Sequence, residues 1–80
     1  MMTRRVSYTV VIEKGPTSYG AYVPDLPGCV AVGDSAAEVK RLIRQAIAFH
    51  IEGMVQDGEA PPPARARSTT IEARIPGKAP

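Results

Sequence analysis

The sequence predicts a small α+β domain with the element order β-β-β-α-β, an antiparallel sheet with one long helix packed on one face. Three segments alternate apolar and polar residues with the period of a β-strand, and a fourth is a short apolar run. One longer segment repeats apolar residues at the i, i+3, i+4 spacing of a helix. Since 80 residues make one domain at most, the sheet and the helix must share one core.

The first three expected strands lie in the N-terminal half of the chain. Residues 6–12 alternate and are rich in β-branched and aromatic residues, which favour strands. A turn at residues 14–17 leads to a returning strand at residues 18–23, so the two segments form a hairpin. Residues 29–32 form a third, short strand, which Gly33 ends.

The segment Pro24-Asp25-Leu26-Pro27-Gly28 separates the second and third expected strands. Two prolines cannot lie in a central strand, because proline lacks the N–H that the ladder needs. Gly28 can take a positive φ without a steric penalty. We therefore expect a loop of defined shape, with Leu26 as its apolar anchor.

The helix is expected at residues 36–56. Ser35 is the predicted N-cap and Glu38 lies three residues on, the spacing of a capping box. Gly58 is a suitable terminator. One apolar stripe runs along the helix: Val39, Leu42, Ile43, Ala46, Ile47, His50, Ile51 and Met54.

The chain after the helix divides into a proline-rich connector at residues 59–67 and a predicted fourth strand at residues 68–75. The strand prediction rests on alternation, with Thr69, Ile71, Ala73 and Ile75 on one face. This strand would return to a sheet edge of its own subunit or of a neighbour. Residues 1–80 thus form a single domain, with its core at about residues 5–58.

The composition limits how so short a chain can be stabilised and which classes of function it can have. One cysteine and one histidine exclude an internal disulfide and a structural zinc site, so we expect no cofactor and a homodimer or homotetramer. The lone cysteine fits a reducing, cytoplasmic setting. No segment is typical of a signal peptide or membrane span. A net charge of +2 is low for a dedicated nucleic-acid binder.

A series of short motifs resembles the HicB family, the antitoxins of type II toxin–antitoxin systems, over residues 6–63. The run from Pro24 to Cys29, followed at a fixed distance by Gly33-Asp34-Ser35, is the most specific part. The other motifs are Ile12-Glu13-Lys14, Tyr19-Gly20-Ala21-Tyr22-Val23, Glu52-Gly53 and Asp57-Gly58-Glu59.

The resemblance implies a partial RNase H-like fold and a protein partner, a HicA-type toxin that cleaves mRNA. It implies that the chain neutralises this toxin by covering its active surface. Many HicB proteins also carry a C-terminal DNA-binding domain. Only 17 residues follow Pro63 here, without helical periodicity, so we expect no complete domain of that kind.

Two alternatives to protein binding depend on charged residues. A metal-dependent RNase H-like nuclease would rest on Asp25 and Asp34, but two acids make a poor metal site and we expect no catalytic or metal-binding residue and no enzyme. A nucleic-acid-binding role, at a promoter for example, would use basic residues near the two ends of the chain. These are Arg4, Arg5, Arg65, Arg67, Arg74 and Lys78.

Protein binding leads to two sets of predicted residues. The partner-binding set is Tyr22, Pro24, Asp25, Leu26 and Pro27. The oligomer-interface set is Phe49, Val55 and Ile71, because apolar residues beyond the helix stripe suggest a second burial surface. We interpret His50 as a core or interface residue and Cys29 as a buried, unreactive thiol.

Overall fold

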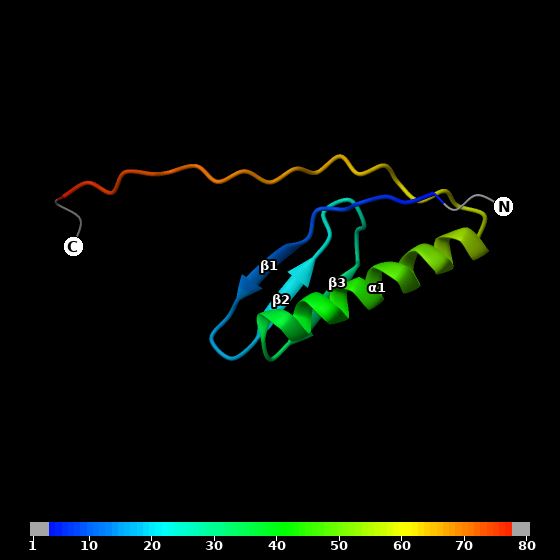
Figure 1. The fold of residues 1–80 in the computed structure, drawn as a ribbon, viewed down its shortest axis with the longest axis horizontal. Coiled ribbons are helices and arrows are strands. Elements are labelled where there is room, and N and C mark those ends of the chain that lie inside the picture. The colour runs from blue at the N-terminus through cyan, green and yellow to red at the C-terminus, as the bar shows by residue number, and fades with distance from the viewer. Residues whose placement is uncertain (1–3, 78–80) are drawn as a thin grey trace.

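The computed structural model describes residues 4–77 and contains a three-stranded antiparallel sheet with one helix across it (Figure 1). The strands lie in sequence order, β1-β2-β3, and the helix α1 follows them. Their bounds are Val11–Lys14 for β1, Tyr19–Tyr22 for β2, Val30–Gly33 for β3 and Ala36–Gln56 for α1. The predicted α+β class and the helix bounds are confirmed.

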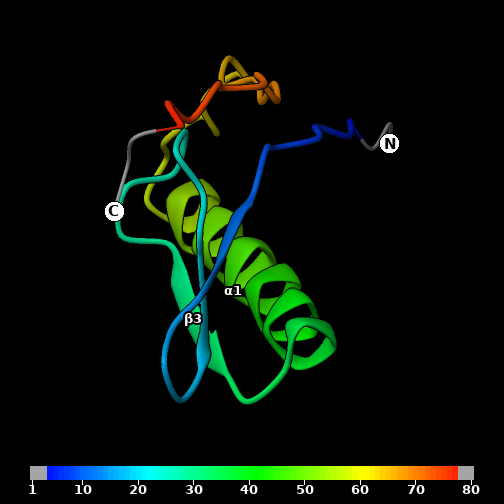
Figure 2. The same ribbon diagram turned by 90° about the vertical axis from the view of Figure 1, so that its left-hand side faces the viewer.

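The register of the strands assigns their residues to two faces. Ile12, Ala21 and Ala31 form one cross-strand row, and the burial of Ala21 in the core identifies this as the helix-facing side. Val11, Tyr22 and Val30 form the next row, on the opposite side. The helix packs most extensively on β3, less on β2 and least on β1. It therefore covers the sheet unevenly (Figure 2).

The start of the helix differs from a standard capping box in one bond. The Ser35 hydroxyl accepts from the Glu38 N–H at 3.0 Å, as predicted. The Glu38 carboxylate accepts instead from the Asp34 N–H, one residue before the cap, at 2.8 Å. Gly33 lets the helix begin close to the sheet, because a Cβ there would lie 3.0 Å from the Val39 nitrogen.

The helix ends in a Schellman motif. Gly58 takes φ +78° and its N–H donates to the Val55 carbonyl, while the Glu59 N–H donates to the Met54 carbonyl at 2.8 Å. Both bonds satisfy carbonyls that the last helical turn would otherwise leave free. Gly58 is thus the terminator, as the sequence predicted.

In the described part of the chain, six apolar residues form the buried core: Ala21, Val23, Leu26, Cys29, Val39 and Ile43. They come from β2, the loop before β3, and the first half of α1. Val39 and Ile43, one helical turn apart, bring the helix onto this cluster. Tyr8, Val10, Ala46 and Met54 are among the half-buried residues packed around it.

Two strand predictions need correction. The first strand begins at Val11 and not at residue 6, because its partner β2 ends at Tyr22 and the chain then turns at Pro24, leaving residues 6–10 without a ladder. Residues 68–75 are extended but belong to no sheet of the described single chain (Figure 1). A strand needs a hydrogen-bonded neighbour, and this segment lies away from the sheet. Its pairing with another subunit stays a prediction.

Candidate protein-binding surfaces

The loop between β2 and β3 consists of two consecutive β-turns. The Leu26 N–H donates to the Val23 carbonyl at 3.0 Å, and the Cys29 N–H donates to the Leu26 carbonyl at 3.0 Å. Each turn has proline at its second position, and Gly28 supplies the φ of +85° that a type II turn requires at its third. The Val23 N–H closes the loop by donating to the Cys29 carbonyl at 3.2 Å.

These turns divide the predicted partner-binding residues between the core and the surface. Leu26 is 1% exposed and anchors the loop in the core, as the sequence predicted. Pro24 and Pro27 are exposed, and Tyr22 is 42% exposed. The prolines and the tyrosine therefore offer surface to a partner, whereas the leucine fixes their positions. Contact of this loop with a partner stays a prediction.

Asp25 joins the loop to the segment that follows the helix. One of its carboxylate oxygens, Oδ2, accepts from the backbone N–H groups of Arg65 and Ala66, both at 2.9 Å. The Tyr8 hydroxyl donates to the Pro62 carbonyl at 2.6 Å. Desolvation, and secondarily the charge of Asp25, raises the pKa of Tyr8. The sequence contained no signal for this anchor, because its partners are backbone groups 40 residues away.

The sheet face opposite the helix, here called the outer sheet face, is apolar and open. Its apolar residues are Val11, Tyr22, Val30 and Val32, and Glu13 and Gly20 lie in the row of Val32. Val30 is 63% exposed and Val32 is 67% exposed, although both are β-branched strand residues. This face was not predicted from the sequence. Alternation in residues 29–32 was the available signal, since Cys29 and Ala31 point inward and the two valines outward.

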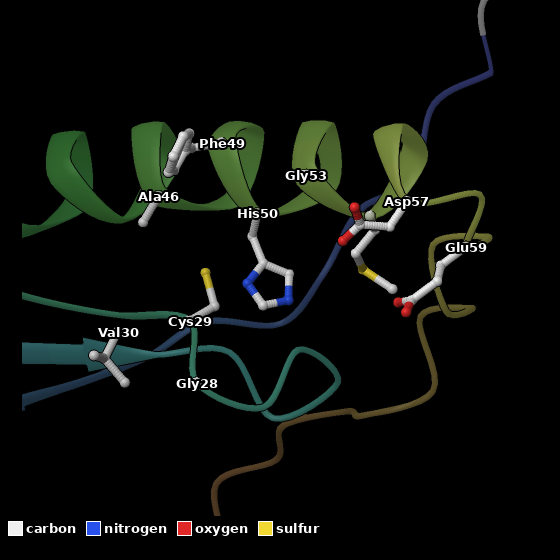
Figure 3. Close-up of a pocket in the computed structure, with 10 residues that line it drawn as sticks. Gly28, Cys29, Val30, Ala46, Phe49, His50, Gly53, Asp57 and Glu59 are labelled. Atoms are coloured by element: carbon white, nitrogen blue, oxygen red, sulfur yellow. The ribbon is translucent and has the colours of Figure 1, made fainter.

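A hollow of about 500 Å³ lies between the second half of α1 and the start of β3 (Figure 3). The half-buried His50 projects into it toward Cys29, and the carboxylates of Asp57 and Glu59 lie at its far end. Cys29 is 3% exposed, and burial raises the pKa of its thiol. The thiol therefore stays protonated and buried, as expected.

The acidic residues of the nuclease alternative do not assemble. Asp25 precedes β3 and Asp34 follows it, so the strand separates them. The Asp25 carboxylate binds the connector backbone. Within residues 4–77, no three histidine, cysteine or acidic side chains lie close enough to hold a metal ion.

The basic residues are spread along two segments. Residues 8 and 9 contact the connector through the Tyr8 bond and a bond from the Thr9 hydroxyl to the Ala66 carbonyl at 2.8 Å. Arg65 and Arg67 lie at this junction, whereas Arg74 lies on the extended segment beyond it. Lys78 falls outside the described residues. No helix among the described residues is long and apolar enough to cross a membrane.

The three predicted oligomer-interface residues are all exposed: Phe49 by 76%, Val55 by 59% and Ile71 by 81%. Phe49 lines the hollow beside β3. Val55 is six residues further along the helix, roughly 120° around its axis. One flat interface cannot easily use both side chains. Their roles stay predictions.

Comparison with known proteins gives consistent matches. Residues 8–75 match the family described as HicB_like antitoxin of bacterial toxin-antitoxin system. An uncharacterized 14.9 kDa protein of Haemophilus phage HP1 is 46% identical over 68 residues, 85% of this chain and 48% of the phage protein. The chain thus spans about half the length of that relative.

Two relatives carry the name UPF0150 protein. The one from Thermoplasma acidophilum is 35% identical over 69 residues, which is 85% of this chain and 100% of the archaeal protein. The one from Helicobacter pylori is 43% identical over 47 residues, 59% of this chain and 65% of that protein. The domain described above therefore spans the whole length of one relative.

Proposed function

Because the chain belongs to the HicB-like antitoxin family, we propose that it neutralises a small HicA-type toxin ribonuclease by binding it directly. The observation that carries the proposal is the outer sheet face, with its exposed Val30 and Val32 next to the rigid loop. A monomeric domain seldom leaves such a face open unless a partner covers it.

The geometry suggests how the contact forms. β3 is an edge strand, so one side of its backbone is free to pair with a strand of the toxin. Val30, Val32 and Tyr22 would then bury apolar surface, while Pro24 and Pro27 contact the partner at the end of the strand. The two turns hold these groups before binding, which lowers the entropy cost of association.

Inhibition by this contact requires no chemistry from the antitoxin. A protein seated over the RNA-binding surface of the toxin excludes the substrate sterically. The toxin then regains activity whenever the complex dissociates, so inhibition should follow the affinity of the two proteins.

Co-expression with the HicA-type protein encoded beside this chain tests the proposal. The two proteins should co-purify, and mRNA cleavage should cease. Val32→Asp should weaken the complex at least roughly tenfold, because a carboxylate would be desolvated in the contact. Val55→Asp, on the helix, is the matched control and should bind normally. A neighbouring toxin that neither binds nor is inhibited would refute the proposal.

A further inference from the structure

The segment after the connector carries exposed apolar residues, and the β1 edge of the sheet has exposed apolar residues beside it. We propose that residues 68–75, here called the arm, pair with β1 of a second copy of this chain, so that two copies exchange arms. The proposal concerns self-association and uses a different surface from the toxin contact.

The side of the core beneath β1 is incomplete. Ile12 lies in the same helix-facing row as Ala21, yet Ile12 is 41% exposed and Ala21 only 5%. The cause is the helix, which packs least on β1. An apolar groove of about 370 Å³ results, here called the β1 groove. It is lined by Val10, Ile12, Ile43 and Ile47, with Lys40 and Arg44 at its rim.

The edge of β1 is also free. The sheet order in the described part of the chain is β1-β2-β3, so β1 pairs there on one side only. A strand added there would place every second side chain over the β1 groove, because strand residues alternate between faces. The groove and the edge thus require an extended segment with apolar residues at alternate positions.

The arm has that pattern. Ile71 and Ile75 fall on one face with Thr69 and Ala73, and Glu72 falls on the other. Ile71 is 81% exposed and Ile75 is 80% exposed, so neither side chain is buried in its own subunit. Its backbone is extended and runs beyond the sheet (Figure 1).

The residues just before the arm explain why the arm of a second copy fits the β1 groove better than the arm of the same chain. Asp25 and Thr9 fix residues 65 and 66 through the bonds described above. Insertion of the arm into its own groove would require a bend within Arg67 and Ser68, a hinge without glycine. Exchange lets the arm continue straight, and short hinges favour exchange for this reason.

Exchange would also supply the missing core. Among residues 4–77 only six apolar side chains are buried in one subunit, and a chain this short needs additional burial to be stable. In a two-fold dimer each copy donates one arm and receives the other, so both β1 grooves are filled. No part of the chain must unfold for this to occur.

Sedimentation equilibrium of the full chain provides the first test. The chain should be a dimer, and Ile71→Ser should raise its dissociation constant roughly a hundredfold through the loss of a buried isoleucine side chain. Ile12→Ser, on the receiving side, should act in the same direction. Val32→Ser, on the outer sheet face, should leave the dimer unchanged. Circular dichroism would confirm that each variant remains folded.

Three outcomes of this test would overturn the proposal: a monomer at all concentrations, a dimer that tolerates Ile71→Ser, or a dimer lost with Val32→Ser or Phe49→Ser instead. Toxin binding is measured separately on the same variants. A variant that no longer dimerises but still binds the toxin tests the arm proposal alone. A variant that still dimerises but no longer binds the toxin tests the proposed function alone.

Cross-linking separates exchange from insertion of the arm into its own subunit. In a Cys29→Ser background, one chain carries Glu13→Cys in β1 and another carries Thr70→Cys in the arm. A mixture of the two should yield a covalent heterodimer with a flexible bismaleimide, whose reach tolerates a shift in register. If one chain carrying both cysteines is instead bridged internally and stays monomeric, the arm occupies its own subunit and the exchange proposal is wrong.

Discussion

At the scale of single residues, the loop before β3 depends on positions with little freedom. Leu26 is buried while its neighbours Pro24 and Pro27 are exposed, so one side chain secures the whole loop. Gly28 supplies the backbone conformation that the second turn requires. Cys29 completes the core behind the loop as a small apolar group.

Gly28→Ala should lower the free energy of unfolding by about 1 kcal/mol, because φ is +85° there and an L side chain is strained in that region. No atom lies within 4 Å of the added Cβ, so the strain is conformational and not steric. Gly53→Ala is the matched control. Its site is helical with equal space, and alanine should raise the free energy by about 0.5–1 kcal/mol. Urea denaturation measures both, and equal effects would contradict the assignment.

Cys29 should make stability fall with pH above neutrality. Burial raises the pKa of its thiol, so the unfolded chain loses this proton first, at about pH 8.5. Between that pH and the folded pKa the unfolded state binds fewer protons, and stability decreases as pH rises. Below about pH 8 the thiol contributes no slope. Urea denaturation from pH 7 to 9.5 should show a steeper decline for the parent chain than for Cys29→Ala. Parallel curves for the two chains would show that burial does not raise the pKa of the Cys29 thiol.

At the scale of elements, the helix is defined by its two ends and by one apolar face. Ser35 and Glu38 satisfy N–H groups at the start, and the Schellman motif satisfies carbonyls at the end. The stripe gives the helix a side to bury, but only Val39 and Ile43 are fully buried. Of the other members, Ala46, His50 and Met54 line the hollow beside β3, and Ile47 lines the β1 groove.

Ser35→Ala should reduce stability by about 1 kcal/mol, the usual cost of losing an N-cap hydrogen bond. Glu38→Gln should be milder, because the amide oxygen can still accept from the Asp34 N–H. Glu52→Gln, at an exposed position near the other end of the helix, serves as the control for the loss of one negative charge. Thermal unfolding followed at 222 nm would rank the three. A Ser35→Ala variant as stable as the control would show that the cap is dispensable.

At the scale of the whole molecule, long-range contacts connect the ends of the chain to the loop. Tyr8 and Thr9 bind the connector from one side, and Asp25 binds it from the other. These bonds join residues 40 to 57 positions apart and determine where the arm begins. The same small body thus presents an outer sheet face and a separate arm, two surfaces with different proposed partners.

Asp25→Ala should free the connector without unfolding the core, because within residues 4–77 its carboxylate bonds only to the Arg65 and Ala66 backbone. Limited trypsin digestion should then cleave after Arg65 and Arg67 several-fold faster, since protease access follows local opening. Asp34→Ala, at the other end of β3, is the control and should leave these sites unchanged. Mass spectrometry of the first fragments identifies the cleavage sites in each variant. Equal cleavage in both variants would argue against the anchor.

The sequence by itself determined the class of the fold, the bounds of α1, the loop with its buried Leu26, and the family resemblance. These features arise from local periodicity, capping and turn chemistry, which act between residues close in the chain. Only the tertiary structure decided that Asp25 holds the connector, that Val30 and Val32 form an open face, and that β1 is poorly covered. Those features depend on where the helix lies across the sheet. The fourth strand marks the boundary, because alternation in residues 68–75 predicts an extended segment, whereas a strand exists only where a neighbouring backbone completes its hydrogen bonds.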